Sequence, residues 1–127
     1  MKLDGFTHRR VYLPVARNNL APDLEIFDVA NPEMTSGDRP LTTVPTQALY
    51  LLNSPFLQKR AANLAQQAYA MPEAVVWLHQ AILGRAPNDA AAKRANDFIE
   101  QSGGDREKAL ADLAHVLLAS TEFLFLE

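Results

Sequence analysis

Apolar residues recur at steps of three and four positions over most of the second half of the chain, starting near Ser54. This spacing places them on one face of an α-helix. The first such stripe runs from Phe56 to Tyr69 and ends before Pro72. The pattern returns in three further segments, 72–83, 88–102 and 105–118. It predicts a series of short amphipathic helices that bury their apolar faces against one another.

The segment Thr42–Leu57 contains two helix starts and the densest apolar cluster. Pro45 suits the first turn of a helix, because its fixed φ is helical and the amide hydrogen it lacks would have no partner there. Thr43 precedes it as a possible cap. Ser54 and Pro55 repeat this arrangement, and a proline also disfavours the α conformation of the residue before it. The segment therefore predicts a short helix, a bend and a longer helix.

Turn-forming residues divide the rest of the helical part. Pro72 is predicted to start the third helix, and Gly84 to cap its C-terminus. Asn88 is predicted to cap the next helix, which Gly103-Gly104 ends. Asp105 is predicted to cap the last long helix. Each assignment rests on backbone preferences within a few residues.

The first 41 residues lack a sustained helical period and are rich in proline. Within them, Arg10–Val15 has the composition of an extended segment, and Pro22 suits the start of a short helix through Phe27. We therefore expect an all-α fold, a compact bundle of five to six short helices with an irregular, proline-rich N-terminal arm. The whole chain, 1–127, would form one helical domain, with the arm at 1–41 and the bundle at 42–127.

Composition excludes several classes of partner and cofactor. The chain has 127 residues, the size of one domain, and 12 basic residues against 15 acidic ones give a net charge of −3. No basic patch is visible, so nucleic acid is not an expected partner. The chain has no cysteine, which excludes disulfides, thiolate metal sites and covalent haem attachment through cysteine. No apolar run approaches the ~20 residues that span a bilayer, so no membrane insertion is expected.

The sequence carries no recognisable catalytic motif. The three histidines, His8, His79 and His115, are isolated, without the spacing that would place two metal ligands on one helical face. Asp23 and Glu25 sit at the start of a predicted helix, where the helix dipole explains acidic residues. We therefore assign no catalytic residue, no metal ligand and no cofactor.

The densest polar cluster lies in the arm and supplies the candidate ligand-binding residues Arg9, Arg10, Arg17, Asn18 and Asn19. Guanidinium and amide groups bind carboxylates, sulfates and sugar hydroxyls through paired hydrogen bonds, so an anion or a glycan is a conceivable ligand. The alternative is structural: the arginines pair with nearby aspartates and fasten the arm to the bundle. The residues alone leave both interpretations open.

The chain ends in Phe123-Leu124-Phe125-Leu126, an unusually apolar sequence for a terminus. Such a segment must dock on the core, bind a partner or stay exposed. We take Phe123, Phe125 and Leu126 as candidate partner-docking residues. A ligand pocket between helices near Trp77 and His79 is a further possibility, although tryptophan and tyrosine, here Tyr12, Tyr50 and Trp77, are first expected in the core.

Several motifs together resemble a known family. They are, in chain order, HRRVYLPVARNNL at 8–20, IFDVANP at 26–32, TTVPTQALYLLNSPFL at 42–57, ILGRAP at 82–87 and LAHVLLASTEFLFL at 113–126. In this order they are similar to the C-terminal part of a planctomycete family catalogued as domain of unknown function 1553. Its proteins also carry a planctomycete cytochrome c-like domain.

The resemblance implies a context and no residue roles. Longer members of that family are thought to be exported, which would make this chain a fragment of a larger multidomain protein. The haem motif belongs to a different domain, so no haem is assigned here. Association of the family with sulfatases and polysaccharide-degrading systems suggests a glycan context.

Two functional hypotheses follow. In the first, the chain is a structural or interaction module that docks on an upstream domain of the same protein, or on another protein, through the arm and the apolar C-terminus. In the second, the polar arm residues contribute to a glycan-binding, anion-binding or hydrolase site that other domains complete.

Overall fold

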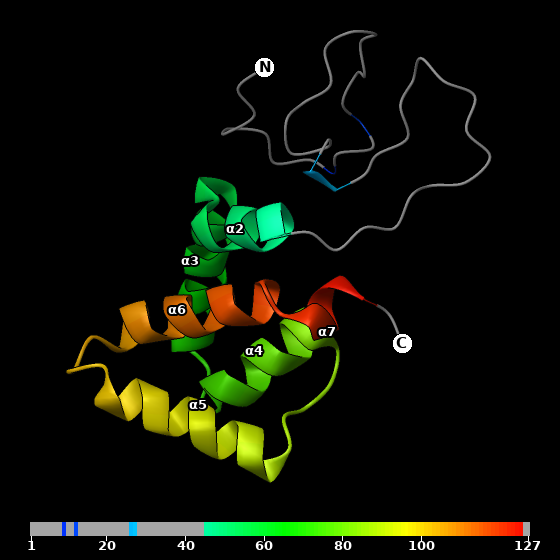
Figure 1. The fold of residues 1–127 in the computed structure, drawn as a ribbon. Helices are drawn as coiled ribbons and strands as arrows, with labels where there is room; N and C mark the ends of the chain where they lie inside the picture. Colours follow the sequence, from blue (N-terminus) through cyan, green and yellow to red (C-terminus); the bar gives the residue numbers. More distant parts are fainter. Residues whose placement is uncertain (1–8, 10–11, 13–25, 28–44, 126–127) are drawn as a thin grey trace, which may run out of the picture. The chain divides into compact units, whose positions relative to one another are not determined.

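In a computed structural model, the structure describes residues 9, 12, 26–27 and 45–125 (Figure 1). Contacts divide the chain into two compact units, residues 1–50 and residues 51–127, and each unit is described by itself. The described residues form six α-helices and no strand. The predicted all-α class of short helices is thus confirmed.

The helices follow one another with short connections. In chain order they are α2 (Pro45–Asn53), α3 (Pro55–Tyr69), α4 (Ala74–Leu83), α5 (Asp89–Gln101), α6 (Arg106–Leu118) and α7 (Thr121–Leu124). The unit of residues 51–127 contains the last three residues of α2 and all of α3 to α7. These helices hold the core and the C-terminal turn.

Helix boundaries follow the predicted local signals. Pro55 is the first residue of α3, with Ser54 as its N-cap in an extended conformation. Gly84 ends α4 with φ = 73°, a left-handed conformation that glycine adopts without the steric cost of a Cβ atom. The Asn88 side chain accepts a hydrogen bond from the amide of Ala91 at 2.8 Å. The Asp105 side chain accepts one from the amide of Lys108 at 3.0 Å.

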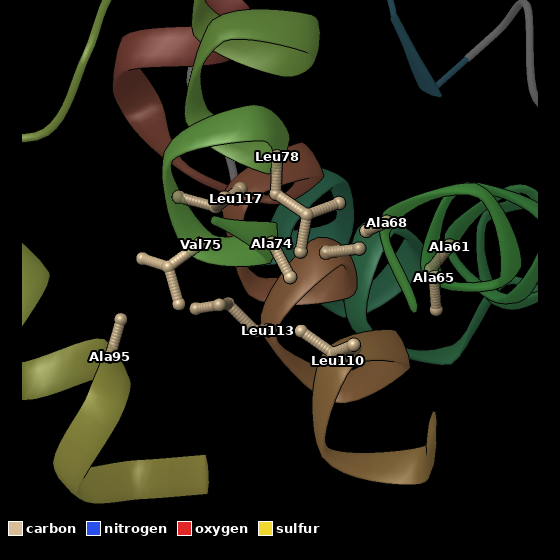
Figure 2. Packing of buried hydrophobic residues seen from close by; sticks show 11 residues of the cluster. Ala61, Ala65, Ala68, Ala74, Val75, Leu78, Ala95, Leu110, Leu113 and Leu117 are labelled. Carbon is tan, nitrogen blue, oxygen red and sulfur yellow. The ribbon is translucent and has the colours of Figure 1, made fainter. Parts of the chain in front are cut away.

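The core of this unit centres on the contact between α3 and α6, the most extensive between any two helices. Ala61 and Ala65 line the buried face of α3, and Leu110 lies on that of α6 (Figure 2). Ala114 of α6 belongs to the same cluster, and all four side chains are almost fully buried. Small alanine side chains allow the two helix backbones to approach closely. The remaining members of the buried cluster are Ala68, Ala74, Val75, Leu78, Ala95, Leu113 and Leu117.

Some details differ from the prediction. Pro72 lies in a turn, and α4 begins two residues later at Ala74, because the Trp77 amide makes the first helical bond, 2.9 Å long, to Glu73. Ser54 lies at the N-cap position of α3, but its side chain makes no capping hydrogen bond. The predicted cap Thr43 lies outside the described residues.

Two aromatic residues on the predicted apolar faces are exposed. Tyr69 lies at the end of α3, where its ring is covered on one side by the Arg106 guanidinium, 5.6 Å from the ring centre. Phe98 lies on α5, a helix that buries only Ala95. Trp77, predicted to lie in the core, packs against the buried cluster while remaining partly exposed. Helical spacing marks an apolar face, but neighbouring helices decide how much of that face is covered.

Little of the predicted arm lies within the described residues. Tyr12 was expected in an extended, core-facing position; instead it is 71% exposed and its amide donates a 3.1 Å hydrogen bond to Arg9 in a 3₁₀ turn. Further along, the ring of Phe27 meets that of Tyr50 edge-on at 5.5 Å, and the side-chain amide of Gln47 donates to the carbonyl of Ile26 at 2.9 Å. The rest of the predicted strand and of the short helix after Pro22 lies outside the described residues.

Candidate functional site

Of the ligand-binding candidates in the arm, the structure describes one, Arg9. Arg9 is exposed to solvent. The other four, Arg10, Arg17, Asn18 and Asn19, lie outside the described residues. Both interpretations of this polar cluster, a ligand site and an anchor for the arm, therefore stay predictions.

The partner-docking candidates lie on and after α7, a single helical turn. Ser120 caps this turn, since its hydroxyl oxygen accepts a hydrogen bond from the Phe123 amide at 3.3 Å. The same hydroxyl donates to the carbonyl of Leu117 at 2.7 Å, which links the start of α7 to the end of α6. The Leu124 amide bonds the Ser120 carbonyl at 3.3 Å, and the Phe125 amide bonds that of Thr121 at 2.9 Å. These bonds define the backbone of the turn.

An ion pair with two hydrogen bonds joins α7 to the loop after α4. Nε of Arg85 donates to Oε1 of Glu122 at 2.5 Å, and a terminal guanidinium nitrogen of Arg85 donates to Oε2 at 2.8 Å. The other terminal nitrogen bonds the carbonyl of Ala86 at 3.1 Å. This paired geometry, with two roughly parallel N–H···O bonds, is the strongest form of such a contact. It connects residues 37 positions apart in the sequence.

Gly84 places Arg85 for this contact. Its left-handed conformation ends α4 and turns the chain at once, so that Arg85 is the first residue beyond the turn. Helix α7 contacts both α4 and α6 (Figure 1), and its residue Glu122 bonds Arg85 there.

The electrostatics of the pair follow from this geometry. The hydrogen bonds from Arg85 lower the pKa of Glu122 and outweigh partial desolvation, which raises it; electrostatic attraction to Arg85 and His79 lowers it further. In return, the hydrogen bond and charge of Glu122 raise the pKa of Arg85. Both side chains are about half exposed, 49% for Arg85 and 46% for Glu122, so solvent and salt screen the attraction.

The apolar side chains of this region remain exposed. Phe123 is 45% exposed, Leu124 37% and Phe125 47%, and no residue of α7 is buried. We call Phe123–Phe125 the terminal apolar segment. Val116, on the last turns of α6, is 61% exposed. The candidates Phe123 and Phe125 are therefore accessible, whereas Leu126 lies outside the described residues.

Two histidines use their rings to bond backbone carbonyls. His79 is buried in α4, and its Nδ1 lies 2.8 Å from the carbonyl of Val75. Nε2 of His115 lies 2.8 Å from the carbonyl of Leu51, which ties the end of α2 to α6. Because a carbonyl accepts, each of these nitrogens carries the proton. Across the described parts of the chain, no group of three or more histidine and acidic side chains is placed to hold a metal ion.

Cavities open between helices at two places among residues 45–125. The larger, about 350 Å³, lies between the start of α4, the end of α5 and the start of α6. Its lining combines the apolar Val75 and Ile99 with the charged Glu73, Glu100 and Arg106. The smaller, about 270 Å³, lies between α3 and the start of α6. Neither is lined by Trp77 or His79, so the ligand pocket expected there stays a prediction.

These observations define the class of the protein: an all-α protein of short helices with an exposed apolar turn at its C-terminal end. The sequence model of a family described as "Protein of unknown function (DUF1553)" matches residues 2–99. The chain belongs to this family, as its motifs indicated. The match ends before α6 and α7, so the last motif, at 113–126, lies beyond it.

The remaining comparisons add no relatives. No curated protein and no protein of known structure shows significant similarity to the chain. None of the described helices has the length and apolar character needed to cross a membrane.

The Arg85–Glu122 pair is the contact that sequence reasoning missed. Both residues stood in motifs of the family resemblance, ILGRAP at 82–87 and LAHVLLASTEFLFL at 113–126, but no local rule joins positions this far apart. Two signals for this contact were available in the sequence. A charged residue follows directly after a glycine helix cap, and an acid lies in the first turn of a terminal helix.

Proposed function

We propose that this chain is a helical docking module, and that its terminal apolar segment binds an apolar surface of another folded domain, on the same polypeptide or on a separate protein. The observation that carries this proposal is the exposure of three consecutive apolar side chains, Phe123, Leu124 and Phe125, at 37 to 47%. Their backbone is at the same time held by a cap and by a paired ion contact.

Two physical arguments support this role. Clustered exposed apolar side chains commonly mark interaction sites, and aromatic side chains are frequent anchors in protein interfaces. A binding turn that is already ordered loses less conformational entropy on binding than a flexible one. The charged Arg85 and Glu122 beside the apolar segment match the usual polar rim around an apolar interface centre.

The test compares self-association of the isolated chain with that of two variants. An uncovered docking surface should make the isolated chain associate as its concentration rises, measured by sedimentation velocity. The double variant Phe123→Ser, Phe125→Ser should stay monomeric. The control Phe98→Ser removes a similarly exposed phenylalanine from α5 and should associate like the unmodified chain. A chain that stays monomeric at the highest attainable concentration would overturn the proposal.

A second measurement identifies the kind of partner. A photo-crosslinking amino acid at position 125, introduced in the native host, should form an adduct that a crosslinker at position 98 does not form. An adduct of increased mass indicates a separate protein, and an internal crosslink indicates a domain of the same polypeptide. Equal labelling from both positions would contradict specific docking.

A further inference from the structure

Helix α7 is a structural element with little stability of its own. It has four residues, and an isolated helical turn is unfavourable because few hydrogen bonds offset the ordering of its backbone. None of its residues is fully buried, and Phe123 and Leu124 are still 45% and 37% exposed, so apolar burial contributes less here than in a core helix. Its position therefore depends on a small number of specific contacts.

The Arg85–Glu122 pair is the most specific of these contacts. It joins α7 to the end of α4 through two hydrogen bonds of 2.5 and 2.8 Å. The other polar links, from Ser120 to the Phe123 amide and to the Leu117 carbonyl, hold only the start of the turn to α6. Without the ion pair, the polar contacts described for α7 would all lie within five residues of the chain and would link it to α6 and not to α4.

We propose that the Arg85–Glu122 pair is a salt-sensitive clasp: when it opens, α7 unfolds locally while α3, α4 and α6 stay folded. The free energy of local opening of a single helical turn is small, so even a half-exposed ion pair is a substantial part of it. Salt weakens the pair because both side chains are about half exposed. The clasp is a property of the isolated chain, and it does not rest on the proposed docking function.

Amide hydrogen exchange followed by NMR tests the clasp. The reporters are the amides of Leu124 and Phe125, whose hydrogen bonds exist only while α7 is formed. Ala114, buried in α6, reports on global unfolding. In Glu122→Gln we expect the α7 amides to exchange about two- to fivefold faster, the range for an exposed ion pair. In both proteins they should exchange much faster than Ala114, because α7 opens while α6 stays folded.

Two controls separate the clasp from a general loss of charge. Glu100→Gln removes an exposed acid at the end of α5 and should leave α7 exchange unchanged. Raising the salt concentration from about 0.05 M to about 1 M should speed α7 exchange in the unmodified chain and hardly affect Glu122→Gln. Unchanged α7 exchange in Glu122→Gln would overturn the proposal, and so would α7 amides that exchange as slowly as Ala114 in the unmodified chain.

Charge reversal gives an independent test. Glu122→Arg alone should speed α7 exchange, because it places two guanidinium groups together. Adding Arg85→Glu should restore part of the protection by forming the pair in the opposite direction. A double variant that exchanges no more slowly than Glu122→Arg would show that the pair does not hold α7.

Discussion

Leu110 offers the sharpest test of the core, because its side chain is fully buried at the centre of the contact between α3 and α6. Replacing it with alanine removes three carbon atoms. At ~0.8 kcal/mol for each buried methylene, the lost burial alone amounts to about 2.4 kcal/mol. The cavity left behind adds to this cost, since helices packed through alanines have few flexible side chains that could fill it. We expect Leu110→Ala to lower the free energy of unfolding by about 3 to 4 kcal/mol.

The measurement is urea unfolding of the purified chain, followed by helical circular dichroism. In thermal unfolding, a loss of this size would lower Tm by more than about 12 °C, the shift expected for a unit the size of residues 51–127. Leu52→Ala removes the same atoms from a side chain that is 55% exposed, and should cost less than about 1 kcal/mol. Leu110→Met keeps the volume and should cost less than about 1.5 kcal/mol. Equal losses in Leu110→Ala and Leu52→Ala would refute the assignment of the core.

Two further predictions concern a helix cap and pH. Asn88→Ala removes the side chain that caps α5, and should lower the free energy of unfolding by about 1 kcal/mol, measured by urea unfolding; a loss of only a few tenths would contradict the cap. Arg85 lowers the pKa of Glu122 below its ordinary value near 4.5, so the stability from this ionised carboxylate is fully present above that value and is lost as pH falls through the lowered pKa. The Tm advantage of the unmodified chain over Glu122→Gln should therefore be present at neutral pH and vanish in acid; an advantage that persists in strong acid would contradict this sign.

Helix boundaries could be predicted closely because their causes are local. A proline that cannot donate, a glycine that accepts positive φ and a side chain that bonds an amide three residues ahead act within one turn of the chain. Pro55, Gly84, Asn88 and Asp105 therefore appear where expected. Pro72 did not start α4, because proline tolerates a turn as readily as a first helical position.

The candidate site was predicted in part. The apolar composition of the C-terminal segment was evident in the sequence, and the exposure of Phe123 and Phe125 keeps them available as docking residues. The Arg85–Glu122 contact beside this segment was not predicted, because the two residues meet only after α4, α6 and α7 have packed. The role of the arm residues stays a prediction.

By itself, the sequence determined that this protein is built of short helices and where most of them begin and end, since these depend on backbone sterics and hydrogen bonds within a few residues. The tertiary structure alone decided that α3 packs most closely on α6, that His79 is buried and Phe98 exposed, and that Arg85 reaches Glu122. Those outcomes depend on which helical faces cover one another, a choice made by the summed packing of residues that are far apart in the chain.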